Sequence, residues 1–275
     1  MTYEFDTLQV DVSGRVAQVT IDNPPINLMD QALYVDLLKL SATLEADPDL
    51  SVVVLKSANP EFLIAHFDVG LILDFPTNAA PAREDTLNPF HQMCERFRTM
   101  DKLTIAQLEG RAGGGGSELA LSCDLRYGVK GKTMINQMEV PIGIIPGGTG
   151  TQRLPRLVGR ARALEIIVGG VDLDAETAER WGYLNRVFDS DDIAPFVNAL
   201  AARVASFPVD AVRLAKESVN NAELPLSEGL REEAYLFQRA LRSDEARSAM
   251  KKFLELGGQT REGELRVADL VAKIP

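Results

Sequence analysis

The stretch "GRAGGGGSELALSCD", residues 110–124, places four consecutive glycines between a strand-like apolar run and a helix-like apolar run. Because glycine has no Cβ, such a loop accepts positive φ angles and lets another backbone or a ligand come close. A phosphate-binding P-loop needs Lys and then Ser or Thr after its last glycine, and here Ser117 and Glu118 follow instead. The dinucleotide pattern GxGxxG also fails, because Glu118 falls where its third glycine belongs. The loop is therefore not a nucleotide-phosphate site.

Two explanations of the glycines remain open. The first N–H groups of a helix have no partner inside the helix, and the helix dipole adds positive character there. A carbonyl oxygen that becomes an enolate would be stabilised by such a donor, by about 2.7–4 kcal/mol in measured cases. Alternatively, the glycines only allow the strand and the helix to pack tightly.

Two glutamates carry the candidate chemistry. Glu118 falls in the first turn of the predicted helix, where the dipole should lower its pKa and keep it ionised. Glu139 is the only charge in "INQMEVPIGIIPGG", so desolvation should raise its pKa and retain a proton. Together they would form a base and an acid. Each residue also has a non-catalytic explanation. Glu118 could be a solvated acid at the start of a helix, and Glu139 could occupy an exposed position on a strand edge.

Hydrophobic periodicity predicts a βα body followed by a helical tail. The predicted elements are a hairpin at 8–22, a helix capped by Asp30, a strand at 51–57, a long surface loop at 57–81, a helix at about 82–100, a strand at 102–110, and helices throughout the segment after Ser206.

Composition narrows the classes of function. Among 275 residues, 29 basic and 40 acidic side chains give a net charge of −11, which argues against general affinity for nucleic acid or anionic membranes. The amino terminus lacks the pattern of a secretion signal, and no apolar run is long enough to suggest a membrane span. Cys94 and Cys123 form no CxxC pair. We expect a cytoplasmic protein with reduced thiols and no metal site.

Three segments, "GRAGGGGSELALSCDLRY", "MEVPIGIIPGGTGTQRLPRLVGRARALEI" and "AERWGYLNRVF", resemble the enoyl-coenzyme A hydratase/isomerase (crotonase) superfamily. The resemblance implies an α/β fold, a crotonase-like spiral of ββα units with a helical C-terminal region. It implies a core at 1–205 carrying the active site and a helical region at 206–275 that forms a homotrimer or homohexamer. The implied partner is an acyl-coenzyme A thioester, so coenzyme A belongs to the substrate and no separate cofactor is expected.

The resemblance also assigns site residues. The backbone N–H groups of Phe67 and Gly115 match the family's oxyanion hole, with His66 as an alternative to Phe67. Glu118 and Glu139 match the hydratase glutamates that deprotonate a water and protonate the α-carbon. The other positions that match substrate-binding residues are Ala65, His66, Asp68 and Gly114.

The implied reaction is hydration of a trans-2-enoyl-coenzyme A. The alternatives are isomerisation, C–C bond hydrolysis, thioester hydrolysis, or a trimer that binds acyl-coenzyme A without catalysis. The chain departs from the family pattern at Met138, where Pro is usual, and by one extra residue between Cys123 and Glu139. Lys251 and Lys252 are candidates for contacts with the coenzyme A phosphates.

Overall fold

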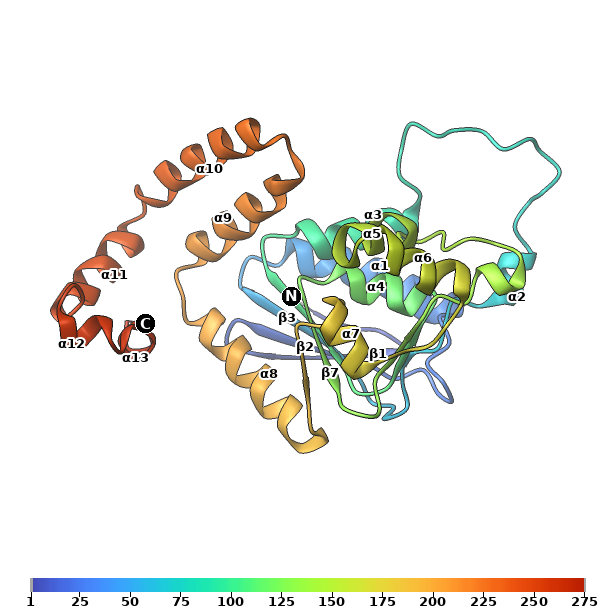
Figure 1. Cartoon of the computed structure of the whole chain (residues 1–275), viewed down its shortest axis with the longest axis horizontal. Coiled ribbons are helices and arrows are strands. Elements are labelled where there is room, and N and C mark those ends of the chain that lie inside the picture. The colour runs from blue at the N-terminus through green and yellow to red at the C-terminus, as the bar shows by residue number, and fades with distance from the viewer. Residues whose placement is uncertain (1, 275) are drawn as a thin grey trace.

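Two β-sheets form the body of the protein in a computed structural model that describes residues 2–274 (Figure 1). The larger sheet has the order β1-β2-β3-β5-β7-β10 and the smaller has the order β4-β6-β8-β9. All neighbours are parallel except the β1–β2 and β8–β9 pairs. The strands are β1 (Leu8–Ser13), β2 (Val16–Ile21), β3 (Val52–Ser57), β4 (Phe62–Ile64), β5 (Leu103–Leu108), β6 (Arg111–Gly113), β7 (Leu125–Val129), β8 (Met134–Asn136), β9 (Leu173–Asp174) and β10 (Arg186–Phe188).

Successive strand pairs step between the two sheets. β3 and β4, then β5 and β6, then β7 and β8 each give one strand to the larger sheet and the next to the smaller sheet, and helices follow each pair. This repetition is the spiral of ββα units that the family resemblance implies. The predicted hairpin at 8–22 is also present, as β1 and β2 paired in antiparallel register.

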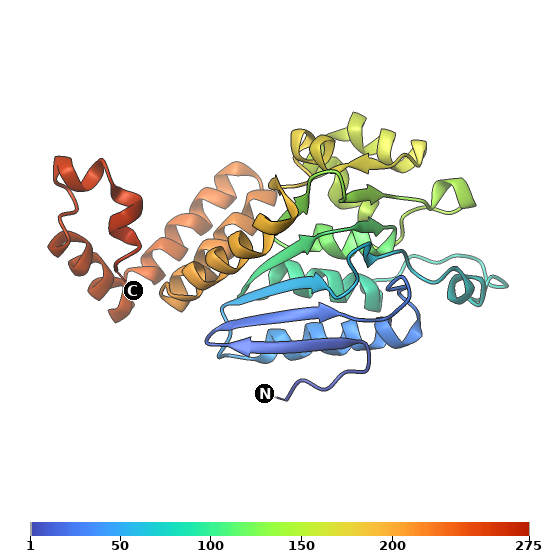
Figure 2. The same cartoon turned by 90° about the horizontal axis from the view of Figure 1, so that it is seen from below.

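Helices cover both faces of the larger sheet (Figure 2). Val52 and Val54 of β3 pack in the cluster that contains Ile193 and Val197 of α8. The alternate residue Val53 packs on the opposite face, in the larger core. The helices of the body are α1 (Gln31–Ala46), α2 (Val69–Leu73), α3 (Pro89–Thr99), α4 (Gly115–Ser122), the 3₁₀ turn η1 (Val140–Ile142), α5 (Gly150–Val158), α6 (Arg160–Gly169), α7 (Ala175–Trp181) and α8 (Ser190–Ala205).

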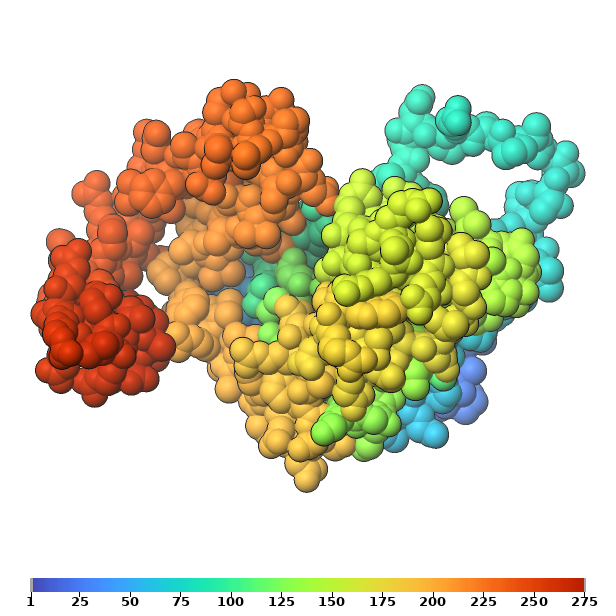
Figure 3. Space-filling view, viewed as in Figure 1, coloured from blue at the N-terminus to red at the C-terminus, as the bar shows by residue number. Residues whose placement is uncertain are grey.

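The segment before α3 corrects the sequence prediction. The predicted helix at about 82–100 begins only at Pro89, because the Asn88 side chain accepts a hydrogen bond from His91 N at 2.8 Å and caps the helix there. Residues 82–88 belong instead to an exposed loop that projects from the body (Figures 1 and 3). The long loop predicted at 57–81 is also interrupted, by β4 and α2.

A helical arm follows the body, as predicted for the segment after Ser206. It consists of α9 (Val209–Asn220), the 3₁₀ turn η2 (Asn221–Glu223), α10 (Leu226–Ala240), α11 (Asp244–Glu255), α12 (Arg261–Glu264) and α13 (Val267–Val271). In the space-filling view α10 to α13 extend away from the body (Figure 3). No helix within residues 2–274 is long and apolar enough to cross a membrane. The division into domains 1–205 and 206–275 stays a prediction.

One buried ion pair joins the arm to the body. Lys216 Nζ of α9 lies 2.7 Å from Asp124 Oδ2 and donates to Lys102 O at 2.7 Å. The two charged side chains are only 9% and 17% exposed. Asp124 Oδ2 also accepts from Thr104 N at 2.8 Å, so this carboxylate links α9 to the start of β5. Removal of the lysine would leave a largely buried carboxylate without its cation.

We expect Lys216→Met to lower the free energy of unfolding by about 3 kcal/mol, since breaking a buried ion pair leaves an uncompensated charge. Urea unfolding followed by circular dichroism measures this change. Arg213→Met is the matched control, because Arg213 lies on the same helix and pairs with Asp210 at the surface. Equal effects of the two substitutions would contradict the role given to Lys216.

Candidate active site

The glycine loop brings the backbone of α4 against the segment after β4. A Cβ on Gly113 would lie 2.3 Å from Ala65 O, and a Cβ on Gly116 would lie 2.7 Å from Ile64 O. Gly114 has a φ of 47°, which side-chain-bearing residues rarely adopt. Tight packing is therefore one reason for the glycines, and it leaves the amino end of α4 beside residues 64–67.

This packing brings two backbone donors together. Phe67 forms a parallel bridge with Met29, in which Met29 N donates to His66 O at 2.9 Å and Asp68 N donates to Met29 O at 3.0 Å. The N–H of Phe67 itself therefore points away from Met29. Phe67 N lies 3.6 Å from the position of a Cβ on Gly115, the first residue of α4. Neither N–H has a hydrogen-bond partner within residues 2–274.

A cavity of about 790 Å³ opens beside these donors. Of the residues that the sequence singles out, Phe67, Gly115, Glu118 and Glu139 line it. Its apolar lining consists of Tyr34, Phe67, Leu71, Ile72, Phe75, Pro89, Phe90, Ile144 and Ile145. The rings of Tyr34, Phe67 and Phe90 form one cluster, with centroids 5.4–6.1 Å apart. The two carboxylates thus face an apolar, partly aromatic space.

The other predicted binding residues do not line this cavity. The Asp68 side chain caps α2 by accepting from Gly70 N at 2.7 Å, and Ala65 N donates to Ile26 O at 3.3 Å. His66 Nδ1 lies 2.9 Å from Phe67 O. Gly114 accommodates Glu139, since a Cβ there would lie 2.9 Å from Glu139 Oε1. Phe67, and not His66, therefore contributes to the wall.

Glu118 is held by the start of α5. The side chain is buried, and its Oε1 accepts from Gly148 N and Gly150 N, both at 2.8 Å. Burial and the nearby charge of Glu139 together raise the pKa of Glu118 to about 7, against the lowering effect of the backbone N–H groups. The sequence-based expectation of a lowered pKa is therefore wrong. Desolvation outweighs the helix dipole because the helix end lies in the interior.

Glu139 precedes η1 and reaches the same cavity. Gln137 Nε2 donates to both of its carboxylate oxygens, at 3.2 and 3.3 Å. Burial raises the pKa of Glu139, although its own backbone N–H, Gln137 and His66 lower it. The expected direction is confirmed. Met138 and the extra residue before Glu139 do not keep this side chain out of the cavity.

Gly148 is a further residue of the site, and sequence reasoning missed it. A Cβ on Gly148 would lie 2.4 Å from Glu118 Oε2 and 2.4 Å from Phe90 Cε1. Because Gly148 has no side chain, the Glu118 carboxylate and the Phe90 ring can both pack directly against its backbone. The available signal was the run "PGGTG", a second glycine-rich turn that precedes a helix. Phe90 carried no such signal, because its role depends on where α3 lies.

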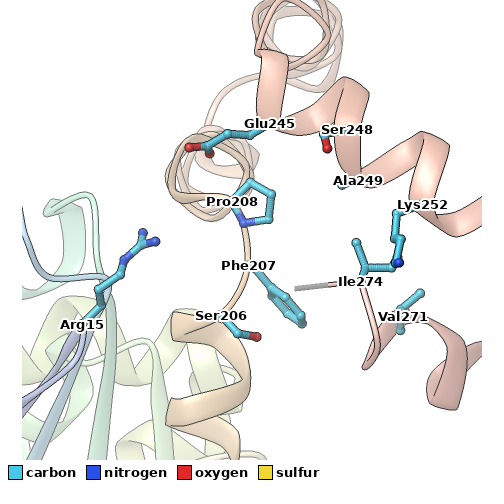
Figure 4. A pocket seen from close by; sticks show the side chains of 10 residues that line it. All are labelled: Arg15, Ser206, Phe207, Pro208, Glu245, Ser248, Ala249, Lys252, Val271 and Ile274. Atoms are coloured by element: carbon cyan, nitrogen blue, oxygen red, sulfur yellow. The ribbon is translucent and has the colours of Figure 1, made fainter.

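A second cavity lies between the body and the arm (Figure 4). It measures about 520 Å³, and Arg15, Phe207 and Lys252 are among the residues that line it. It shares no lining residue with the cavity of the two glutamates. Within one chain, Lys252 therefore does not line the cavity that contains Glu118 and Glu139. Lys251 lines neither cavity.

Neither cysteine side chain is exposed to solvent. Cys94 and Cys123 are free and buried, and burial raises the pKa of each thiol to about 12. Residues 2–274 contain no group of three or more His, Cys, Asp and Glu side chains that could hold a metal ion. Of the groups at the cavity, the buried ones with candidate chemistry are the carboxylates of Glu118 and Glu139 and the backbone N–H groups of Phe67 and Gly115.

Comparison with known proteins matches this chain to one family. The enoyl-CoA hydratase/isomerase family profile matches residues 11–261. A protein named "Probable enoyl-CoA hydratase" from Rhizobium meliloti is 35% identical over 254 residues, which cover 91% of this chain and 95% of the relative. A similarly named protein from Mycobacterium tuberculosis is 33% identical over 257 residues, covering 93% and 96%. An enoyl-CoA hydratase subunit structure from Geobacillus kaustophilus has a TM-score of 0.82 at 31% identity and covers 92% of this chain and 96% of that one.

We expect Gly148→Ala to lower the free energy of unfolding by about 1–3 kcal/mol, because the added methyl group overlaps Glu118 and Phe90. Thermal or urea unfolding measures the change. Gly147→Ala is the matched control, since the nearest atom to its Cβ position is Ile145 O at 3.8 Å. A Gly148→Ala protein as stable as the Gly147→Ala protein would disprove the close contact.

Proposed function

The chain belongs to the enoyl-CoA hydratase/isomerase family, and from this premise we propose that it adds water to a trans-2-enoyl-coenzyme A thioester. The single observation that carries the proposal is the presence of two buried carboxylates and two unpaired backbone N–H groups in one cavity. Hydration needs all four: a base, an acid and two donors for a developing oxyanion. Coenzyme A enters the reaction as part of the substrate.

The oxyanion donors act first in this proposal. The thioester oxygen accepts hydrogen bonds from Phe67 N and Gly115 N, which are free to donate. As water adds to the β-carbon, the double-bond electrons move toward the thioester and its oxygen gains charge. Preorganised donors stabilise such an enolate by about 2.7–4 kcal/mol each, as removal of one donor elsewhere indicates. The apolar wall around Tyr34 and Phe90 excludes bulk water and strengthens these bonds.

The two carboxylates then divide the proton transfers. Glu118, held by Gly148 N and Gly150 N, accepts a proton from the water as the water oxygen bonds to the β-carbon. Glu139 donates its proton to the α-carbon as the enolate collapses. The balance is one water consumed, one proton gained by Glu118 and one lost by Glu139. A base with a pKa of about 7 suits this role, because it is partly ionised and still basic at neutral pH.

Hydratase activity has a direct test. We expect purified protein to deplete the ultraviolet absorbance of crotonyl-coenzyme A or a longer enoyl thioester and to form the 3-hydroxyacyl product. Glu118→Gln and Glu139→Gln should each lower kcat by about 10²–10⁴-fold, the usual contribution of general acid–base catalysis. Below pH 7 the rate should fall about tenfold per unit as Glu118 becomes protonated.

Glu165→Gln is the matched control, because Glu165 is exposed on α6 and should leave the rate unchanged. Binding of the thioesters without any turnover would disprove the hydratase proposal and favour an acyl-coenzyme A binder.

Double-bond migration in place of hydration would favour an isomerase. The pKa of Glu118 supports that second candidate, since a group titrating near neutrality can take a proton from one carbon and return it to another. An isomerase of this kind would tolerate Glu139→Gln.

We also propose that the arm joins three copies, singly or as paired trimers. Apolar side chains on α10 support this: Leu226, Leu230 and Phe237 are 79%, 53% and 63% exposed. Exposed apolar faces of this kind mark protein contacts. Light scattering should give the mass of a trimer or hexamer, and Leu230→Glu with Phe237→Glu should give monomers. Leu164→Glu, on α6, is the control. A monomeric wild-type protein would contradict the proposal.

A further inference from the structure

The turn that holds Glu118 contains two adjacent glycines, Gly147 and Gly148. Gly148 N donates to Glu118 Oε1 at 2.8 Å. A peptide group between two glycines rotates at little cost, because neither residue has a Cβ that opposes the change in its backbone angles. Half a rotation would point Gly147 O at the carboxylate in place of Gly148 N. An interaction that fixes this peptide group therefore also fixes a donor of Glu118.

His91 of α3 contacts the other side of that peptide group. Its Nε2 lies 2.8 Å from Gly147 O. A carbonyl oxygen only accepts, so Nε2 carries the proton of this bond, and both the neutral ring and the imidazolium can supply it. No backbone N–H within residues 2–274 donates to Gly147 O. The carbonyl group is therefore held by the His91 side chain.

One planar peptide group joins the two hydrogen bonds. The bond between Gly147 and Gly148 is trans, so its C=O and its N–H point in opposite directions. A donor at the oxygen therefore directs the N–H toward Glu118. The same hydrogen bond polarises the peptide group, and a polarised N–H donates more strongly.

The start of α3 fixes His91 itself. The Asn88 side chain accepts from His91 N at 2.8 Å and caps the helix. Phe90, the preceding residue, packs against Gly148, since a Cβ there would lie 2.4 Å from Phe90 Cε1. Thr149, the next residue of the turn, has a φ of 127°, a strained conformation that persists only where neighbouring contacts enforce it. The first turn of α3 thus supplies contacts that hold the strained turn in place.

We propose that His91 is a positioning residue for the base: by holding Gly147 O it keeps Gly148 N–H directed at Glu118, and so keeps that carboxylate ionised until it accepts the proton of water. The part played in catalysis rests on the proposed hydratase function. His91 does not line the cavity of the two glutamates, so it acts through the peptide group and not on the substrate. Without His91 the peptide group can turn, and Glu118 loses a donor to its charged form and binds a proton more tightly.

Other ionisable groups face Glu118. Glu139 opposes its charge, and burial raises the pKa of Cys94 and of Tyr183 to about 12, so both are neutral near pH 7. All of these groups stay the same when only His91 is changed, so a difference between variants at position 91 reports on His91. The remaining groups on the surrounding elements are Tyr34 and Asp74 at the cavity, His66 beside Glu139, and Arg153 of α5, which pairs with Glu95 of α3.

The test removes the donor and then restores it. His91→Leu should move the acid limb of the pH–rate profile up by about one pH unit, which lowers the rate at pH 6 by about tenfold, because Glu118 has lost a donor to its charged form. His91→Gln should return the limb to its wild-type position, since the amide nitrogen can reach Gly147 O and does not titrate. A general loss of stability would lower the rate at every pH and leave the limb in place.

Gln92→Leu is the matched control, because Gln92 is the next residue of α3 and its side chain also donates to a carbonyl oxygen, that of Leu87. It should keep the wild-type profile. His91→Asn covers the case in which Leu at position 91 prevents folding. Its amide is one methylene group shorter than that of Gln and should not reach Gly147 O, so the limb should move as in His91→Leu. Loss of the acid limb in His91→Gln would overturn the inference, because His91 itself would then be the titrating group.

A measurement without turnover separates this inference from the proposed function. Infrared titration of the folded protein follows the protonation of Glu118, whose band is identified by its absence in Glu118→Gln. The midpoint should lie at about 7 in the wild type and about one pH unit higher in His91→Leu. A wild type that shows this behaviour but hydrates no thioester contradicts only the proposed function. Equal midpoints in the wild type, His91→Leu and His91→Asn overturn the inference, whatever the activity.

Discussion

The backbones of β6 and α4 lie against residues 64–67 with no space for a side chain between them, and the site depends on this contact. A Cβ on Gly113 or Gly116 would overlap the backbone of Ala65 or Ile64. Because the two segments meet so closely, the N–H groups of Phe67 and Gly115 reach the same cavity although 48 positions separate them in the sequence. The same glycines thus account both for the tight packing and for the two N–H groups that reach one cavity.

A second constraint is the balance of forces on Glu118. Two backbone N–H groups hold its carboxylate, while burial and Glu139 oppose its charge. For the proposed reaction, either set of forces alone would make Glu118 an unsuitable base, either too weakly basic or permanently protonated. The raised pKa means that the folded protein binds a proton more tightly than the unfolded chain does, so this group lowers stability as pH rises from about 4.5 to about 7. The rest of the fold therefore has to offset the loss of stability that Glu118 causes as pH rises.

The sequence predicted the features that local pattern determines. Alternation located the β1–β2 hairpin, β-branched runs located β3 and β5, and a glutamate behind glycines marked the start of α4. The beginning of α3 was missed because helical spacing continues upstream of Asn88, whereas the cap decides where the helix starts. The pKa of Glu118 was missed because burial depends on α3 and α5, which lie far from it in the sequence.

Helix α4 also links the glycine loop to the residue that anchors the arm. Its eight residues span about 12 Å. The amino end carries Gly115, and Asp124, just beyond the carboxyl end, is clamped to Lys216 of the arm and to Thr104 of β5. Helix α4 therefore connects the residue that anchors α9 at one end to the N–H group that is proposed to bind the thioester oxygen at the other.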